Sequence, residues 1–515
     1  MYLTQSLHRA VQQTPDQIAT VCGERVRTFR EHVDRVSALA GALRATGVAQ
    51  GDRVAILSQN SDRYQEFLYA VWWMGGAVNL VNTRWSNKEI TYSLEESGTR
   101  VLFVDDTFVG RVPELVGLWD GLTTLVHCGE GTTPEGMLGY EELIATHDPV
   151  QDERLGGDRL AGVFYTGGTT GLPKGVMLSH ASMLTSVLGS AASLQVYARQ
   201  GTSLQSAPLF HLAALASLNG TVVAGGTNVF LPAFEPVSVL KSIHTHRPTS
   251  LLLVPAMIQM LVDHPTARDY DLSSVQRIAY GASPISEAVL DRAMTAFPGA
   301  GFVQAYGMTE LSPAATGLTA EDHLHKHRLR SAGRALASTE VRVVDIEDRE
   351  VPRGTVGEVV ARGGNVMLGY WNKPEETAEA LRGGWMHTGD AGYLDEEGYL
   401  YLVDRMKDMI VTGGENVYSA EVENAVAKHP AVASCAVIGV PDATWGERIH
   451  AVIVLQPGRG STAEEIREHC KALIAGYKSP RTCEFVESLP LSPAGKILKR
   501  DLRKPYWENA ERSVN

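Results

Sequence analysis

Cysteine is scarce in this chain, and basic residues do not outnumber acidic ones. The 515 residues include five cysteines, an odd number at scattered positions without the spacing of a metal site. Reduced thiols in a cytosolic protein therefore fit better than a disulfide framework. The net charge of −13 leaves no positive excess to neutralise nucleic-acid phosphates, which argues against nucleic-acid binding as the main role. The cysteines are Cys22, Cys128, Cys435, Cys470 and Cys483.

The sequence also has little that would direct it to a membrane or across one. Its first residues lack a charged segment followed by an apolar one, so no secretory signal is expected. The most apolar stretch, 251–262, is interrupted by Pro255 and Gln259 and is too short to span a bilayer. The last residues do not match a peroxisomal Ser-Lys-Leu signal. We expect a cytoplasmic protein without a transmembrane segment, and peripheral membrane contact stays open.

What the chain does have is length and an apolar content of 44%, enough for a substantial core and more than one domain. Through roughly the first 400 residues, short β-branched runs alternate with longer amphipathic stretches. This alternation predicts an α/β fold with sheets covered on both faces. The expected parallel strands are 54–57, 76–81 and 100–104, and the expected covering helices are 29–46 and 61–74.

The pattern changes near Asp404. Two runs before it, 358–362 and 399–403, indicate strands of a smaller β-rich region. After it, the order helix, strand, strand, helix spans about 110 residues, the size of a small domain. The sequence therefore predicts a large N-terminal domain, 1–404, of covered mixed or parallel sheets plus a small β-rich subdomain, followed by a small α+β domain, 405–515. The four C-terminal elements are expected at 420–428, 433–439, 450–455 and 463–474.

A loop rich in glycine and threonine, Tyr165-Thr-Gly-Gly-Thr-Thr-Gly-Leu-Pro-Lys-Gly175, follows the apolar run 160–164. Such a loop after a strand can offer backbone N–H groups and hydroxyls to a polyanion, and Lys174 adds a positive charge. It is not a Walker A loop, because Gly-Lys-Ser/Thr is absent at the required spacing. By itself, the loop is compatible with phosphate binding and with an ordinary surface turn.

Four further segments follow this loop in a fixed order: Gln304-Ala-Tyr-Gly-Met-Thr-Glu310, Trp385-Met-His-Thr-Gly-Asp390, Asp404-Arg-Met-Lys-Asp-Met-Ile410 and Pro493-Ala-Gly-Lys496. With these five segments the chain resembles the adenylate-forming (ANL) superfamily, in its acyl-CoA synthetase or fatty acyl-CoA ligase branch. The resemblance extends over nearly the whole chain. The stretch from Gly384 to Asp408 is similar to the fatty acyl-CoA synthetase signature.

The resemblance implies an ATP-dependent acid:CoA ligase. A carboxylic acid and ATP with Mg²⁺ would give an acyl-AMP and pyrophosphate, and the acyl group would then pass to CoA. It implies a C-terminal domain that moves about a hinge at Lys407, and a homodimer is possible. A different acceptor, a carrier protein or an amine, is the alternative. A pseudoenzyme is disfavoured because Lys174, Glu310, Asp390 and Lys496 are all present.

The resemblance also assigns residues to ATP or AMP. Tyr306 would stack on adenine, and Asp390 and Arg405 would reach the ribose, although an isolated Gly-Asp is often only a turn. Gly167 stands where the family usually has serine, so one hydroxyl donor is missing there. The expected ATP- and AMP-binding residues are Thr166, Gly167, Gly168, Thr169, Thr170, Gly171, Lys174, Gly281, Ala282, Ser283, Tyr306, Gly307, Asp390 and Arg405.

The expected catalytic residues are Lys496, Thr309, Glu310 and His211. By resemblance, Lys496 bridges the carboxylate and the α-phosphate, and Thr309 binds the α-phosphate. Glu310 and Thr166 would hold Mg²⁺, although an isolated Thr-Glu pair also suits a helix N-terminus.

The expected acyl pocket comprises His211, Ala214, Met257 and Ala282. By resemblance, the segments 208–215, 253–257 and 311–315 form its walls. They are apolar and rich in alanine, which suits an apolar acid, whether fatty, aryl or alicyclic. His211 stands where amino-acid-activating relatives have an aspartate, which argues against an α-amino acid. The pantetheine tunnel is expected at Gly413, Gly414 and Glu415.

Overall fold

The computed structural model describes residues 1–166, 172–405, 408–413, 415–442, 444–490 and 497–507, with only the backbone of Arg405 and Asn416. The chain forms two compact units. The first comprises Met1–Val341 and Ala361–His387, and the second Arg342–Val360 and Thr388–Asn515. The boundary at residue 404 stays a prediction; this division groups 342–360 and 388–404 with the C-terminal residues.

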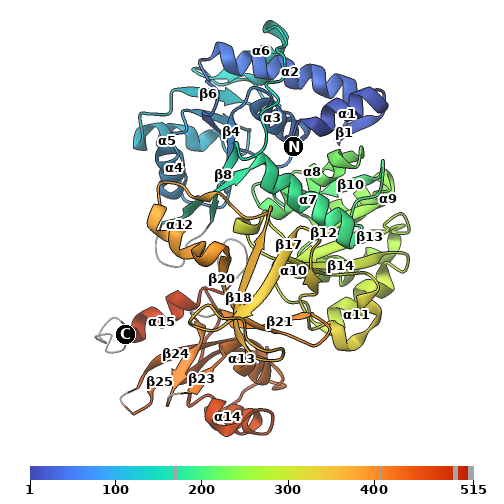
Figure 1. Cartoon of the computed structure of the whole chain (residues 1–515). Helices are drawn as coiled ribbons and strands as arrows, with labels where there is room; N and C mark the ends of the chain where they lie inside the picture. Colours follow the sequence, from blue (N-terminus) through green and yellow to red (C-terminus); the bar gives the residue numbers. More distant parts are fainter. Residues whose placement is uncertain (167–171, 406–407, 414, 443, 491–496, 508–515) are drawn as a thin grey trace. The chain divides into compact units, whose positions relative to one another are not determined.

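A nine-stranded sheet lies in the first unit, and its strands from β14 to β1 are parallel to their neighbours (Figure 1). Antiparallel strands close it at both edges. In spatial order the strands are β16 (Arg334–Ala335), β15 (Thr316–Leu318), β14 (Gly301–Tyr306), β13 (Arg277–Gly281), β12 (Ser250–Leu253), β10 (Thr202–Gln205), β11 (Thr227–Phe230), β1 (Ile18–Cys22) and β2 (Arg25–Thr28).

An eight-stranded sheet lies in the same unit and ends in an antiparallel hairpin. The three expected strands of the first hundred residues form its parallel centre, which confirms that prediction. In spatial order the strands are β19 (Gly369–Tyr370), β9 (Lys174–Ser179), β8 (Leu160–Thr166), β4 (Ala77–Leu80), β3 (Arg53–Leu57), β5 (Val101–Val104), β6 (Thr124–His127) and β7 (Leu138–Gly139).

The helices of this unit begin where short polar side chains can cap them. Thr28 and Glu31 form a capping box at the start of α2, and Ser61 accepts the Tyr64 N–H at the start of α3. These two helices confirm the expected helices 29–46 and 61–74. The helices are α1 (Gln5–Gln13), α2 (Phe29–Ala45), α3 (Asp62–Trp73), α4 (Asn87–Glu96), α5 (Val112–Leu118), α6 (Tyr140–Thr146), α7 (His180–Leu194), α8 (Leu212–Val223), α9 (Pro236–His246), α10 (Pro255–Val262), α11 (Glu287–Ala296) and α12 (Pro374–Ala380).

The second unit contains the C-terminal sheet and most of the small β-rich one. The small sheet has the order β17 (Thr339–Val344), β18 (Gly357–Gly363), β20 (Met386–Leu394) and β21 (Leu400–Arg405). The other sheet has the order β23 (Glu415–Val417), β22 (Ile410–Thr412), β25 (Gly446–Leu455) and β24 (Val432–Asp442), with β26 (Thr482–Phe485) on β25. Its helices are α13 (Ser419–Ala427), α14 (Ala463–Lys471) and α15 (Lys499–Trp507).

These elements confirm the α/β fold class and the helix, strand, strand, helix order after Asp404. The expected last helix, 463–474, is shorter than predicted and ends at Lys471. The apolar stretch 251–262 is divided between the end of β12 and α10, because Pro255 occupies the first turn of that helix. Within the described part of the chain, no helix is both long and apolar enough to cross a membrane.

Candidate active site

The Thr/Gly loop connects β8 to β9, and the structure describes its base. Thr166 and Lys174 are paired across the antiparallel hairpin, as are Tyr165 and Gly175. Gly167, Gly168, Thr169, Thr170 and Gly171 lie outside the described residues. The hairpin therefore places the first and last polar residues of the expected phosphate loop side by side.

A tyrosine that the sequence analysis did not identify lies beside this base. The Tyr370 hydroxyl donates a hydrogen bond to Oε1 of Glu310 at 2.9 Å. Its ring faces the Lys174 ammonium, with 5.1 Å from Nζ to the ring centroid. Tyr370 and Glu310 are buried, with 9% and 6% of their surface exposed. The structure thus brings together two expected site residues, Lys174 and Glu310, through one aromatic side chain.

The segment containing Tyr370 is attached by its backbone to both sides of this cluster. The Met367 N–H donates to the Glu310 carbonyl at 2.9 Å, and the Trp371 N–H donates to the Gly175 carbonyl at 2.7 Å. Between them, Tyr370 pairs with Val176 of β9. Since Gly175 directly follows Lys174, the segment 367–371 fixes the hairpin and the 3₁₀ helix of Glu310 relative to each other.

Glu96, at the end of α4, contacts both Tyr165 of this hairpin and Trp371, which follows Tyr370. Its carboxylate accepts the Tyr165 hydroxyl, and its backbone carbonyl accepts the Trp371 indole N–H at 2.9 Å. Burial and the nearby Glu96 carboxylate raise the pKa of Tyr165, so its hydroxyl stays protonated as a donor. The residues on both sides of the Gly/Thr loop are therefore held by side chains distant in sequence.

Four other expected site segments lie at the carboxyl ends of neighbouring parallel strands in the nine-stranded sheet. They follow β10, β12, β13 and β14, which pair in parallel as neighbours. Ligands of open α/β sheets bind outside the carboxyl ends of such strands. His211, Met257 and Ala282 follow β10, β12 and β13, and Tyr306 is the last residue of β14.

The glycines at this edge have a packing role that the sequence analysis did not anticipate. A Cβ at Gly281 would lie 2.4 Å from the carbonyl oxygen of Ala305, and one at Gly307 would lie 2.1 Å from that of Pro313. Both positions need glycine because neighbouring backbone occupies the space. Ala282 has φ +67° and is exposed, and Ser283 next to it is also exposed.

The expected acyl-pocket residues differ in their surroundings. His211 is the N-cap residue of α8 and its ring centroid lies 4.4 Å from that of Phe210. Ala214 is buried in the main core, whereas Met257 is half-buried against the second core cluster.

Thr309 and Glu310 belong to a 3₁₀ helix, Thr309–Leu311, and not to the start of an α-helix.

In the second unit, Asp390 and Arg405 are paired across β20 and β21. Asp390 is buried, and its N–H donates to Thr388 Oγ1 at 3.1 Å. It therefore lies within a strand, unlike the turn aspartate considered as an alternative. The structure brings together the backbones of the two residues assigned to ribose.

Lys407, the expected hinge, and Lys496, the expected catalytic lysine, lie outside the described residues. Near them, the Asp404 carboxylate accepts the Ser419 hydroxyl at 2.7 Å and the Ala420 N–H at 3.1 Å. Lys499 donates to Ser419 Oγ at 2.6 Å and pairs with Glu423 at 2.8 Å. No motif in the sequence marked Ser419, Glu423 or Lys499, because only the fold brings α15 to α13.

The expected tunnel residues occupy a tight hairpin. Thr412 and Glu415 are paired across β22 and β23, with Gly413 in the turn at φ +63° and Gly414 outside the described residues. A Cβ at Gly413 would lie 2.8 Å from the Trp445 ring. Glycine is therefore needed here both for the backbone conformation and for the close indole.

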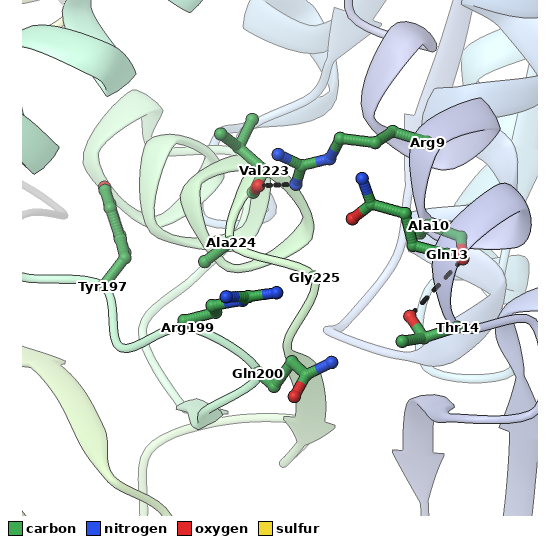
Figure 2. Close-up of a pocket in the computed structure, with 10 residues that line it drawn as sticks. All are labelled: Arg9, Ala10, Gln13, Thr14, Tyr197, Arg199, Gln200, Val223, Ala224 and Gly225. Atoms are coloured by element: carbon green, nitrogen blue, oxygen red, sulfur yellow. Dashed lines mark hydrogen bonds between the residues drawn. The ribbon is translucent and has the colours of Figure 1, made fainter.

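A pocket of about 530 Å³ lies elsewhere in the first unit, at the end of α8 (Figure 2). The Arg9 guanidinium donates to the Val223 carbonyl, the Gln200 N–H to the Ala224 carbonyl, and Gln17 to the Gly225 carbonyl. These contacts cap the helix C-terminus, where cations are favourable. None of the expected site residues that the structure describes lines this pocket, whose walls are Arg9, Ala10, Gln13, Thr14, Tyr197, Arg199, Gln200, Val223, Ala224 and Gly225.

Comparison with known proteins agrees with this arrangement. A family model described as AMP-binding enzyme matches residues 7–371, and one described as AMP-binding enzyme C-terminal domain matches 421–496. The chain is 37% identical to fatty acid–acyl-carrier-protein ligase ScoC of Streptomyces coeruleorubidus, over 99% of this chain and 97% of that one. It is 38% identical to a feruloyl-CoA synthase of Amycolatopsis sp, over 97% and 98%.

Solved structures extend this likeness to the fold. The amide bond synthetase McbA of Marinactinospora thermotolerans superposes with a TM-score of 0.86 at 30% identity, over 98% of this chain and 100% of that one. The chain therefore belongs to the AMP-binding enzyme family, within the adenylate-forming superfamily. It is an enzyme of the AMP-forming acid–CoA ligase group, as the resemblance in its motifs implied.

Proposed function

We propose that this chain is an ATP-dependent acid:CoA ligase for an apolar carboxylic acid, with a fatty acid first among the candidates and aryl or alicyclic acids next. The observation that carries the proposal is the joining of Lys174 and Glu310 through Tyr370 beside the base of the Thr/Gly loop. A cation and a carboxylate held together there suit a nucleotide polyphosphate with its metal ion.

The proposed site would bind Mg²⁺ with only two protein ligands. Among the described residues, no group of three His, Cys, Asp or Glu side chains could hold a metal. Magnesium commonly takes one or two carboxylates and completes its shell with phosphates and water. Glu310 and Thr166 would hold it, and when bound it would neutralise charge on the phosphates.

Adenylation joins two anions, so this chain must reduce their repulsion and align them. Lys174 would lie along the phosphates, Thr309 would donate to the α-phosphate, and Lys496 would bridge carboxylate and phosphate. Tyr306 and the pair Asp390–Arg405 would hold adenine and ribose. His211, Ala214, Met257 and Ala282 would line the acyl site.

Transfer of the acyl group to CoA is the second half of the proposal. It would need the C-terminal domain to turn about Lys407 and bring Gly413, Gly414 and Glu415 to the pantetheine. The relatives favour this acceptor only in part, because one is named a CoA synthase, one an acyl-carrier-protein ligase and one an amide bond synthetase.

The test separates the two halves. Pyrophosphate release is first measured across a panel of medium-chain, long-chain, aryl and alicyclic acids. The preferred acid is then supplied with CoA, with a holo carrier protein or with an amine, and products are identified by mass spectrometry. Acyl-CoA as the fastest product supports the proposal. A faster carrier-bound or amide product would replace CoA as the acceptor, and no pyrophosphate with any acid would overturn the proposal.

A further inference from the structure

The side chain of Tyr370 contacts both Lys174 and Glu310. Its hydroxyl lies 2.9 Å from Glu310 Oε1, and its ring centroid lies 5.1 Å from Lys174 Nζ. Its backbone N–H donates to Thr377 Oγ1 at 2.8 Å, which anchors the residue to α12. The backbone of Tyr370 is thus held by α12, while its hydroxyl contacts Glu310 and its ring contacts Lys174.

The Tyr370 hydroxyl donates to a carboxylate oxygen of Glu310, and both residues are buried. A hydrogen bond to an ionised carboxylate is stronger and more directional than one between neutral groups.

We propose that Tyr370 is a positioning residue for the nucleotide site, whose hydroxyl orients the Glu310 carboxylate toward the metal-bound phosphates and whose ring holds the Lys174 ammonium. The proposal rests on the proposed function, because it assigns Glu310 to Mg²⁺. Tyr370 itself would touch neither the substrate nor the reacting atoms.

Two substitutions at this position separate the two contacts. Tyr370→Phe removes the hydroxyl and keeps the ring beside Lys174. Tyr370→Leu removes both. Since partners that orient a metal-binding carboxylate typically contribute about 10–100-fold to metal affinity, Tyr370→Phe should raise the Mg²⁺ concentration for half-maximal effect by that factor. Tyr370→Leu should, in addition, weaken ATP binding without Mg²⁺ by about 2–5-fold, the size of an ordinary cation–π contact.

The chain offers a matched control in the same unit. The Tyr140 hydroxyl donates to Glu66 Oε2 at 2.8 Å, and the guanidinium of Arg63 lies 5.5 Å from the Tyr140 ring centroid. Tyr140 and Glu66 are buried, with 2% and 0% exposed. Tyr140→Phe therefore removes the same type of bond from the same type of cluster, outside the expected site.

The experiment measures ATP binding to the full-length chain by calorimetry, with Mg²⁺ varied and with Mg²⁺ chelated, and adenylation rates over the same Mg²⁺ range. Thermal unfolding and circular dichroism establish that each variant is folded. The proposal expects a shifted Mg²⁺ dependence for Tyr370→Phe with ATP binding in chelator unchanged, and no shift for Tyr140→Phe.

Two results would overturn it. One is an unchanged Mg²⁺ dependence in folded Tyr370→Phe, which would make the tyrosine purely structural. The other is a loss of ATP binding in Tyr370→Phe that is equal with and without Mg²⁺, which would mean that the hydroxyl does not act through the metal. The calorimetric result does not require any acid or acceptor. A wild type that binds MgATP yet releases no pyrophosphate would therefore refute the proposed function while still testing Tyr370.

Discussion

Two tyrosine–glutamate clusters in the first unit resemble each other closely, and they differ in what surrounds the carboxylate. Tyr140 donates to Glu66 at 2.8 Å and Tyr370 donates to Glu310 at 2.9 Å, and each ring has a cation over it. Glu66 also pairs with Arg35 at 2.8 Å and with Arg27 at 3.4 Å, between helices α2 and α3 and strand β2. Glu310 lies in the 3₁₀ helix Thr309–Leu311 that follows β14, and Tyr370 links it to Lys174 of the hairpin that carries the Thr/Gly loop.

The difference predicts that the same chemistry serves stability at Glu66 and ligand binding at Glu310. The charge of Glu66 is neutralised by arginines within the protein. Replacing Glu66 should therefore destabilise the fold and leave ligand binding unaffected. Glu310 is linked through Tyr370 to Lys174, at the base of the expected phosphate-binding loop, so replacing Glu310 should disturb ligand binding and leave folding nearly intact. The predictions below test this contrast in order of expected effect.

Glu66→Gln should give the largest loss of stability. The substitution keeps the shape but removes the buried carboxylate that pairs with Arg35 and Arg27. Because Arg35 keeps Glu141 as a partner, the loss should lie below the cost of an uncompensated buried charge, which is about 3–5 kcal/mol. Chemical denaturation monitored by fluorescence measures the change in unfolding free energy. The folded fraction should retain the wild-type Mg²⁺ dependence, and a changed Mg²⁺ dependence would contradict the structural role of this cluster.

Lys496→Ala should give the largest loss of chemistry. Removing one preorganised charge at a developing transition state costs on the order of 10²–10³ in rate. Adenylation, measured as pyrophosphate release, should fall by that factor, while thioester formation from supplied acyl-AMP should persist. Excess Mg²⁺ should not repair the defect, which distinguishes it from defects at Glu310. If both half-reactions fell equally, Lys496 would have to be reassigned to a structural role.

Glu310→Gln should slow adenylation and raise the Mg²⁺ requirement by about 10–100-fold, since a hard cation prefers a charged oxygen to a neutral one. The unfolding free energy should change far less than in Glu66→Gln. A magnesium titration of pyrophosphate release and a denaturation curve on the same preparation measure both quantities. An unshifted titration would remove Glu310 from the metal site.

The smallest effect concerns alkaline pH, where the two clusters should behave alike. Burial raises the pKa of both Tyr140 and Tyr370 above the value of an unfolded tyrosine. Their neutral phenols therefore stabilise the fold fully below pH 10, and this contribution is lost as the pH rises above 10. Between pH 8 and pH 10.5, the free energy of unfolding measured by denaturation should fall less in Tyr140→Phe and in Tyr370→Phe than in the wild type. An equal loss in all three proteins would contradict the shared burial.

Much of the fold follows from local pattern. The helices that start at Phe29 and Asp62 have polar caps and apolar faces readable in the sequence, and both appear within a residue or two of the expected bounds. The helix expected at 463–474 ended early at Lys471, since periodicity alone does not mark a C-terminus. The roles of Lys407, Lys496 and the loop 167–171 remain predictions from resemblance.

The sequence alone determined the α/β class, the adenylate-forming family and the residue types of the Thr/Gly loop, because these depend on short-range pattern and on motifs. Only the tertiary structure decided that Tyr370 joins Lys174 to Glu310, and that Gly281 is needed by the Ala305 carbonyl. The physical reason is that these contacts link strand ends far apart in sequence. A single buried tyrosine carries no pattern that distinguishes a partner 60 or 196 residues away (370 − 310 and 370 − 174) from a core neighbour.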